Sequence, residues 1–213
     1  MLKIISVVNQ KGGCSKTTTA INLALNLHYE DKKICLLDAD PQQSALETLK
    51  GRKKNIITCA PALGDLVTEI EKYKDYDYVI VDTPPHNDEI VENSILCSGL
   101  VIVPVRDSPL DLRSAEKTVE LIRKAKKTNP YTKSAFLISN VSPNTRLYKQ
   151  VKGYLRSEFK DMPIFSTIIH TREIYRQALI YGEAVTEAAP SHVASNEVNA
   201  FTYEVIKMVN NKK

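Results

Sequence analysis

The chain has 213 residues, of which 43% are apolar, so it is long enough to bury one sizeable α/β core and short for two domains. Its amino terminus, MLKIISVVNQ, has only a short apolar run that ends in polar residues, which excludes a signal peptide and a membrane span. The formal net charge is +4, but residues 113–180 hold 14 Lys or Arg against 5 Asp or Glu, while the remainder holds 15 against 20. This polarisation favours nucleic acid or another acidic surface as partner, although a solvated lysine-rich face is a common alternative.

Five short runs rich in Val, Ile and Leu recur without polar alternation, as in strands covered by helices on both faces. These runs are residues 3–8, 34–38, 78–82, 100–105 and 135–139. Helical patterns lie at residues 17–29, 63–73, 88–97, 112–127, 146–159 and 198–209. Strand alternating with helix predicts βαβ units. We therefore expect an α/β fold with a doubly wound, mainly parallel sheet and helices on both faces, in a single domain over residues 1–213.

The first run is followed by NQKGGCSKTTTA, residues 9–20, a glycine-containing loop that enters a helix. Backbone N–H groups and the positive end of the helix dipole bind anions at such a turn. Lys16 would reach the terminal phosphates of a nucleotide, and the Thr17 hydroxyl would bind Mg²⁺.

This loop departs from the usual phosphate loop, G-x-x-x-x-G-K-[ST], because Gln10 and Ser15 replace its two glycines. If the Ser15 position needs a left-handed backbone, serine costs about 1–2 kcal/mol there. If it does not, serine is nearly neutral. We expect the loop to bind nucleotide in either case, because the residues around Ser15 match the motif.

Carboxylates end two further strands. LLDADPQQSA, residues 36–45, places Asp38 and Asp40 after the second run, and YVIVDTPP, residues 78–85, places Asp82 at the end of the third. Ligands of such sheets bind beyond the carboxyl ends of the strands. Asp82 could therefore hold Mg²⁺ through water, and Asp40 could orient a water for attack on the γ-phosphate. The alternative is that Asp38 and Asp40 only cap the following helix.

The motif K-G-G-x-x-K-T-T at residues 11–18 resembles the deviant Walker A motif of the ParA/MinD family of ATPases, in which an extra lysine precedes the glycine pair. D-x-D-P-Q at residues 38–42 and the Walker B-like strand ending at Asp82 resemble the same family. P-V-x-x-S-P-L-D at residues 104–111 is similar to the small, ParF-like plasmid-partition members. FSTIIHTREIYRQALIYGEAV, residues 165–185, resembles the family's late strand and helix. The first strand begins by Lys3, so we expect no amino-terminal helix-turn-helix domain.

The resemblance implies a P-loop NTPase fold and a slow, Mg²⁺-dependent hydrolysis of ATP. Asp40 would activate water, Asp38 would support the metal site and its loop, and residues 84–88, PPHND, would form a mobile switch segment. Lys11 would reach in trans into the phosphates of a second protomer, so that ATP binding drives dimerisation. The residues implied as catalytic are Lys11, Lys16 and Asp40. Those implied as nucleotide-binding are Lys11, Gly12, Gly13, Cys14, Ser15, Lys16, Thr17, Thr18 and, near adenine, Asn140. Those implied at the metal are Thr17, Asp38 and, through water, Asp82.

RLYKQVKGYLRSEFK, residues 146–160, predicts a helix with Leu147, Val151 and Leu155 on one side. Cations fall three or four residues apart along another side, at Arg146, Lys149, Lys152, Arg156 and Lys160. Such a stripe could track DNA phosphates without reading bases, and a solvated helix face is an equal alternative for this helix alone. Charge and resemblance together favour non-specific DNA binding by the ATP-bound dimer, with Arg172 and Arg176 as further candidates.

We therefore expect an ATPase that partitions plasmid or chromosomal DNA, cytoplasmic and nucleoid-associated, with a ParB/ParG-like centromere-binding partner and possible higher assemblies. The alternative is a MinD-like positioning ATPase on a membrane surface, which would need an amphipathic tail. Val198, Phe201, Val205 and Met208 have helical spacing, and a packed last helix without a stable membrane anchor is the interpretation we adopt.

The chain has four cysteines, Cys14, Cys35, Cys59 and Cys97. They lack C-x-x-C pairing, which predicts reduced thiols, with a shared iron–sulfur cluster at Cys97 as a weaker alternative.

Overall fold

The computed structural model describes residues 2–211 apart from 63, 144 and 146, and in this part the chain forms one seven-stranded sheet. All its neighbouring strands run parallel, in the order β3-β2-β4-β1-β5-β6-β7. The fold class predicted from the sequence is confirmed. The strands are β1 (Lys3–Val7), β2 (Ile34–Asp38), β3 (Thr58–Pro61), β4 (Tyr78–Asp82), β5 (Leu100–Val105), β6 (Lys133–Val141) and β7 (Ile164–His170).

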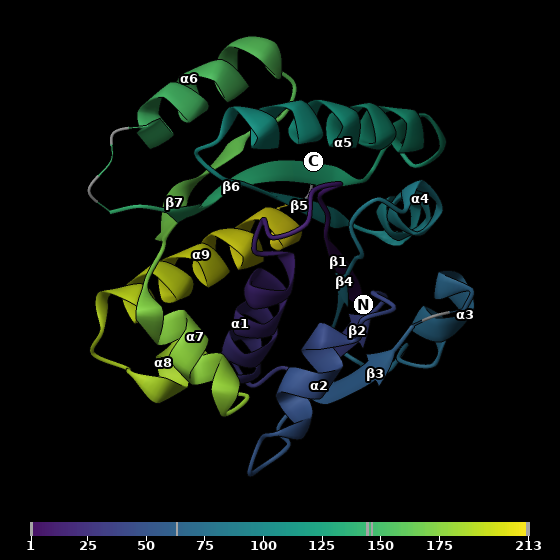
Figure 1. The fold of residues 1–213 in the computed structure, drawn as a ribbon. Helices are drawn as coiled ribbons and strands as arrows, with labels where there is room; N and C mark the ends of the chain where they lie inside the picture. The colour runs from purple at the N-terminus through teal and green to yellow at the C-terminus, as the bar shows by residue number, and fades with distance from the viewer. Residues whose placement is uncertain (1, 63, 144, 146, 212–213) are drawn as a thin grey trace.

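Helices cover both faces of the sheet, as Figure 1 shows. On one face lie α1 (Lys16–His28), α2 (Ser44–Lys50), α7 (Glu173–Ile180), α8 (Val185–Ala188) and α9 (Val193–Asn210). On the other face lie α3 (Leu66–Glu71), α4 (Asp88–Cys97), α5 (Pro109–Thr128) and α6 (Leu147–Glu158). Double coverage explains why the strand sequences lack polar alternation.

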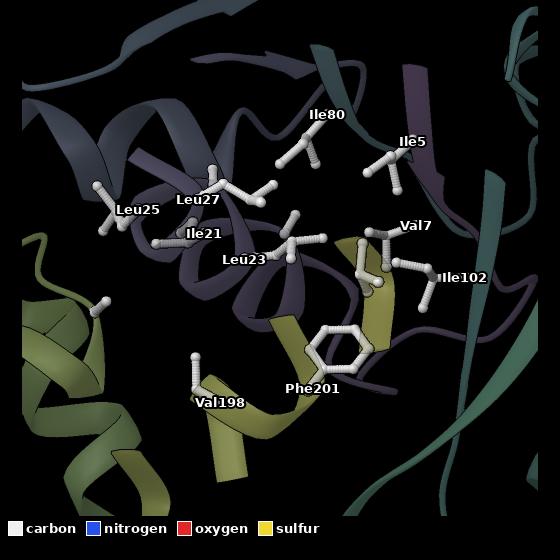
Figure 2. Close-up of a cluster of buried hydrophobic side chains, with 14 of the residues drawn as sticks. Ile5, Val7, Ile21, Leu23, Leu25, Leu27, Ile80, Ile102, Val198 and Phe201 are labelled. Atoms are coloured by element: carbon white, nitrogen blue, oxygen red, sulfur yellow. The ribbon is translucent and has the colours of Figure 1, made fainter. Parts of the chain in front are cut away.

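The larger core lies between the sheet and the pair α1 and α9. Ile5 and Val7 of β1 point toward α1, whose Leu23 and Leu27 are fully buried (Figure 2). Phe201 of α9 closes the same cluster and packs edge-to-face on Phe165 of β7. Because α9 buries its apolar side in this way, the packed last helix expected from the sequence is present.

The boundaries predicted from periodicity differ from the structure mainly at edges and at helix starts. Periodicity did not predict the edge strand β3 or the short helices α2 and α8, since they have too few apolar residues to give a pattern. β7 and α7 were expected only from the family resemblance. α5 begins three residues earlier than predicted, at Pro109, because proline fits the first helical position. Of the predicted helix at 63–73, the structure has Leu66–Glu71, and residue 63 lies outside the described part. No helix in the described residues is long and apolar enough to cross a bilayer.

Candidate nucleotide site

A cavity of about 420 Å³ opens at the carboxyl edge of the sheet. One end is formed by the loop before α1 and by Asp40, and the other end by the segment after β7 and by α9. Most of the residues predicted to bind phosphate, and Asn140 predicted near adenine, therefore line one space, whereas Lys11 and Cys14 do not. Its lining includes Gly12, Gly13, Ser15, Lys16, Thr17, Thr18, Asp40, Asn140, Arg172 and Tyr175.

Lys16 begins α1 and lies at the floor of the phosphate loop. Its side chain is buried, and its Nζ donates a hydrogen bond to the carbonyl of Lys11, 2.9 Å away. The Cys14 thiol donates to the same carbonyl, and burial raises the pKa of this thiol, which therefore stays protonated. The loop thus folds around its own lysine, with the ammonium group held inside the turn where a phosphate would bind.

Ser15 has a left-handed backbone, with φ 73° and ψ 21°, and Gly13 has a φ of 73° as well. Of the two alternatives left open by the sequence, the left-handed one is therefore correct, and serine costs about 1–2 kcal/mol at this position. Ser15 is also the N-cap of α1, yet its side chain makes no capping hydrogen bond. Ser15 also lines the cavity.

Lys11 does not line the cavity. Its Nζ lies 2.7 Å from Oδ2 of Asp111, in the first turn of α5, whose side chain is fully buried. The second carboxylate oxygen of Asp111 is buried and has no partner among the described residues. In the single chain, therefore, the lysine that the sequence predicts to act in trans is held in cis by an acid 100 residues away.

Asp38 and Asp40 have different surroundings. Asp38, at the end of β2, accepts the backbone N–H of Asp40 at 3.1 Å and that of Leu46 at 3.0 Å. Burial raises the pKa of the Asp38 carboxyl more than these backbone hydrogen bonds lower it. Asp38 thus fixes the loop that carries Asp40, whose own side chain lines the cavity beside Ser44. This geometry agrees with a loop-supporting role for Asp38 and leaves Asp40 able to reach a water at the phosphate end.

Asp82 ends β4 directly beside Asp38 and is fully buried. By strict geometry neither of its carboxylate oxygens accepts a hydrogen bond from the described residues, although the Thr17 side chain is close enough to lower the Asp82 pKa. Burial raises the pKa of Asp82 to about 7, more than the nearby Thr17 and Lys16 lower it. A buried carboxylate without a partner is costly, which indicates that a cation or its hydration water completes this site.

The residues around Asp82 fit Mg²⁺ rather than a metal held by protein alone. Nowhere in the described chain do three His, Cys, Asp or Glu side chains gather as a ligand set. Mg²⁺ usually takes one or two carboxylates, a hydroxyl, water and substrate phosphates. Thr17 and the orphaned oxygens of Asp82 supply that donor set once phosphate is present.

Asn140 reaches the cavity because of a bulge in β6. The pairing of β6 with β7 shifts between Ser139 and Val141, and Asn140 adopts a left-handed φ of 53°. Bulges of this kind redirect a side chain next to a site. The Thr171 hydroxyl donates to Oδ1 of Asn140 at 2.7 Å, which fixes the carboxamide at the base end of the cavity.

The base end also contains a cluster of polar groups that was not predicted from the sequence. Glu197 of α9 binds the imidazole of His170 at 2.8 Å and the guanidinium of Arg172 at 2.7 Å. Nε of Arg172 and the hydroxyl of Tyr175 are buried without a partner, and both residues line the cavity. Burial raises the pKa of Tyr175, so its hydroxyl remains a donor toward a ligand. The available signal was the T-R-E-x-Y spacing, which indicated family resemblance and not this cluster.

The segment after Asp82 is joined to the phosphate loop through Gln10. The side-chain Nε2 of Gln10 donates to Oδ1 of Asp88 at 2.7 Å, and the backbone carbonyl of Gln10 accepts the N–H of His86 at 3.2 Å. Lys117 of α5 pairs with the same carboxylate at 3.1 Å. Gln10, which replaces the first glycine of the usual motif, therefore links the loop to the predicted switch segment.

The cations predicted to bind DNA have three different surroundings. Lys149, Lys152 and Arg156 of α6 and the following Lys160 form no ion pair with described residues. Arg172 is held by Glu197 in the cavity, and Arg176 pairs with Glu173 at 3.3 Å while also lining the cavity. Arg146 lies outside the described residues. We name the four cations at 149, 152, 156 and 160 the α6 stripe.

By contrast, three cations of the neighbouring α5 are neutralised. They are Lys117 with Asp88, Arg123 with Asp161 and Lys124 with Glu92. Among the cations counted between residues 113 and 180, those of the α6 stripe therefore form one group that lacks ion-pair partners among the described residues. The position of Arg172 removes it from this surface, because its guanidinium is bound inside the nucleotide cavity.

A parallel sheet with a lysine-bearing glycine loop before α1, a buried aspartate at the end of β4 and a cavity between them defines a P-loop nucleotide-binding protein. The family model described as "CobQ/CobB/MinD/ParA nucleotide binding domain" matches residues 5–185. The chain belongs to this family.

The chain is similar to known proteins over nearly its whole length. The Maintenance of carboxysome distribution protein A of Halothiobacillus neapolitanus is 30% identical over 209 residues, which covers 95% of each chain. The Chromosome-partitioning ATPase Soj of Thermus thermophilus is 27% identical over 241 residues, which covers 96% of each. The fold is also that of the septum site-determining protein MinD from Pyrococcus horikoshii, solved with Mg-ADP, at a TM-score of 0.77 with 17% identity, covering 99% of this chain and 98% of that one.

Proposed function

We propose that this chain is a Mg²⁺-dependent ATPase that dimerises on ATP, binds DNA without sequence preference and positions a cargo on it. The observation that carries the enzymatic part is the cavity itself. Lys16 and Asp40 line its phosphate end, and the unpartnered carboxylate of Asp82 lies beneath Thr17. An unpaired buried acid beside an anion-binding turn is costly in a single chain, and a cation bound together with phosphate would offset that cost.

In this proposal the N–H groups from Gly12 to Thr18 and the ammonium of Lys16 bind the β- and γ-phosphates. Thr17 and, through water, Asp82 hold Mg²⁺, which supplies charge neutralisation on the phosphate oxygens. Asp40 accepts a hydrogen bond from the attacking water and orients it toward the γ-phosphorus. Asn140 contacts the base.

Lys11 acts between chains in this proposal. It faces away from its own cavity and is bound by Asp111, so it must leave that partner to reach a phosphate. A phosphate of a second protomer docked on the same edge would offer it two or more oxygens in place of one carboxylate. Dimerisation would then depend on ATP, because only a bound nucleotide supplies this alternative anion.

The DNA-binding part rests on the α6 stripe. Cations that lack an acidic partner are free to replace the counterions of a phosphate backbone, and their spacing along one helix follows no base pattern. The names of two relatives refer to chromosome partitioning and to carboxysome distribution. For this chain we propose plasmid or chromosomal DNA as the cargo, linked through a ParB/ParG-like partner that stimulates hydrolysis.

A membrane-surface role receives less support. Val198, Phe201 and Val205 of α9 are buried against α1 and the sheet, so they cannot serve as a detachable amphipathic surface without opening the core. Sedimentation with anionic liposomes in ATP and in ADP separates the two proposals. ATP-dependent cosedimentation would favour the membrane role.

The decisive experiment measures ATP hydrolysis and DNA affinity on the same preparations. We expect hydrolysis to require Mg²⁺, and Asp40→Ala to dimerise on ATP while turning over at least about 100-fold more slowly. DNA should bind more tightly with ATP than with ADP. Equal DNA affinity with both nucleotides, or none at low salt, contradicts the DNA-binding proposal.

A variant set tests the α6 stripe directly. The triple change Lys149→Ala, Lys152→Ala and Arg156→Ala should reduce the slope of log K for DNA binding against log salt concentration by about 2 to 3. Each lost phosphate contact accounts for about 1 of this reduction. The double change Lys117→Ala and Lys124→Ala removes ion-paired cations from α5 and should leave the slope almost unchanged. Equal losses in the two sets would mean that net charge, and not the α6 stripe, determines DNA affinity.

A further inference from the structure

Arg106 is the first residue after β5 and lies on the same edge as the phosphate loop. β1 and β5 are parallel neighbours, with Val7 opposite Ile102. Beyond the strands, the amide of Asn9 donates to the carbonyl of Pro104 at 2.7 Å. The chain therefore leaves β5 alongside the phosphate loop, and Arg106 enters the same corner as the pair formed by Lys11 and Asp111.

The Nε atom of Arg106 has no acceptor among the described residues. This atom is buried, and Arg106 forms no ion pair with any described residue, although the residue is only partly exposed. The other cation of this corner, Lys11, is fully paired with Asp111. Burying part of a charged donor without an acceptor is unfavourable, so an unpaired donor of this kind calls for an explanation, such as a ligand or a partner that binds it.

The missing acceptor is not the nucleotide of the same chain. The lining of the cavity includes Lys16, Asp40 and Asn140, but neither Lys11 nor Arg106. An anion that meets Arg106 would therefore come from something that docks on this edge of the sheet. The corner carries two cations and one buried acid, so it fits an anion with several oxygens, which a guanidinium binds with two parallel hydrogen bonds.

We propose that Arg106 enters the nucleotide site of a second copy of this chain and contacts its terminal phosphates beside Lys11. This inference rests on the proposed function, since it needs an ATP-dependent dimer. In hydrolysis the water oxygen bonds to the γ-phosphorus while the bond to the bridging oxygen breaks. The bridging oxygen keeps the electron pair on ADP, and the water proton passes to phosphate or solvent. Negative charge spreads over the γ-phosphate oxygens and the bridging oxygen, where a guanidinium in trans stabilises it.

The first test compares Arg106→Ala with wild type in the absence of DNA. We expect turnover to fall on the order of 100-fold, because Lys11 still supplies one cation. Binding of ATP to the single chain should change less than about threefold, since Arg106 lies outside its own cavity. Lys127→Ala, at the far exposed end of α5, is the charge-matched control and should hydrolyse like wild type. Wild-type turnover by Arg106→Ala overturns the proposal.

The second test distinguishes action in trans from action in cis. Arg106→Ala is mixed with an equal amount of Asp40→Ala, each nearly inactive alone. A mixed dimer has one complete site, formed by Asp40 of the first variant and Arg106 of the second. Random pairing makes half of the dimers mixed, so about a quarter of the wild-type rate is expected. A mixture no faster than its components overturns the assignment in trans.

Two further readouts separate this inference from the proposed function. Mixing Lys11→Ala with Asp40→Ala tests the sandwich itself, and recovery there without recovery for Arg106→Ala overturns only the role of Arg106. Sedimentation with ATP measures dimerisation. If Arg106→Ala loses the dimer but keeps wild-type turnover per dimer, Arg106 binds a partner side chain instead of phosphate, which also overturns the proposal. A wild-type protein that neither dimerises nor hydrolyses ATP overturns both.

Discussion

Charged groups have opposite surroundings at the phosphate end of the cavity and at the junction between α2 and α8. At the phosphate end, Asp82 is buried without a partner and Ser15 has a left-handed backbone. At the junction, Arg52 and Glu187 form a two-pronged pair at 2.5 and 2.8 Å, and Tyr29 donates to the same carboxylate. One region leaves charges unsatisfied, and the other satisfies them within the chain.

This difference separates binding from stability. Groups that a fold leaves strained or unpaired are stabilised only by a ligand, whereas a satisfied buried pair contributes to the folded state alone. Changes at the phosphate end should therefore affect hydrolysis strongly and can even raise stability. Changes at the junction should lower stability and leave chemistry intact.

The largest expected effect is that of Lys16→Ala. Removing the ammonium inside the turn should lower ATP affinity and turnover by more than about 100-fold, because Lys16 contacts the charge that develops in the transition state. Calorimetric titration with ATP and release of phosphate measure the two losses. Lys50→Ala, which removes an exposed lysine of α2, is the control and should match wild type. Retained turnover in Lys16→Ala would falsify the assignment of this cavity as the catalytic site.

Asp82→Asn should separate stability from activity. The substitution removes an unpartnered buried charge at constant shape, so without nucleotide we expect the free energy of unfolding to rise by about 1–3 kcal/mol. Turnover with Mg²⁺ should fall on the order of 100-fold, because the amide binds the hydrated ion poorly. Urea denaturation and steady-state hydrolysis measure the two changes. Asp161→Asn, on an exposed pair, should change stability by less than about 1 kcal/mol. A less stable Asp82→Asn protein contradicts the argument.

Arg52→Ala should have the opposite profile. The pair is largely buried, with side chains 8% and 13% exposed, so its loss should lower the free energy of unfolding by about 3 kcal/mol. Turnover at a temperature where the variant is folded should stay within about twofold of wild type. Arg123→Ala breaks an exposed pair and should cost less than about 1 kcal/mol. If Arg52→Ala loses turnover while folded, the junction takes part in nucleotide binding.

The same pair gives a dependence on pH. Burial raises the pKa of Glu187, but hydrogen bonds from Arg52 and Tyr29 outweigh it, so the net shift is downward. A lowered pKa in the folded state contributes stability above the unfolded value, about 4.3, and this stability is lost as pH falls through the folded value. The destabilisation caused by Glu187→Gln should therefore be full near pH 7 and shrink below about pH 4. A difference that does not change with pH would mean that the carboxylate charge contributes nothing.

The elements that were predicted correctly from the sequence are those marked by a local pattern, either a run of apolar residues or a motif with fixed spacing. The buried runs of β1, β2, β4 and β5 are apolar throughout because both of their faces are covered. The phosphate loop followed from residue types at fixed spacing. β3 was missed because it is a four-residue edge strand with a polar and a proline residue.

Long-range pairing was out of reach of such patterns. Nothing local indicates that Lys11 binds Asp111, that Arg52 binds Glu187, or that Glu197 holds Arg172 in the cavity. The bulge that turns Asn140 inward depends on the register between β6 and β7. Strand register cannot be read from a single sequence. The predicted site residues from the loop, β2 and β6 meet at one cavity because parallel strands end at one edge.

The smallest expected effect is that of Ser15→Gly, and it tests the strain at the phosphate end most directly. Glycine accepts φ 73° without the cost of a Cβ, although it also gains freedom when unfolded. We therefore expect the free energy of unfolding to rise by about 0.5–1 kcal/mol. Gly13→Ala is the mirror-image control, because it adds a Cβ at the same φ in open space and should lower stability by about 1 kcal/mol. ATP affinity distinguishes strain from function. If the Ser15 hydroxyl binds phosphate, Ser15→Gly will be more stable yet bind ATP more weakly, and if strain alone matters, both stability and affinity will rise.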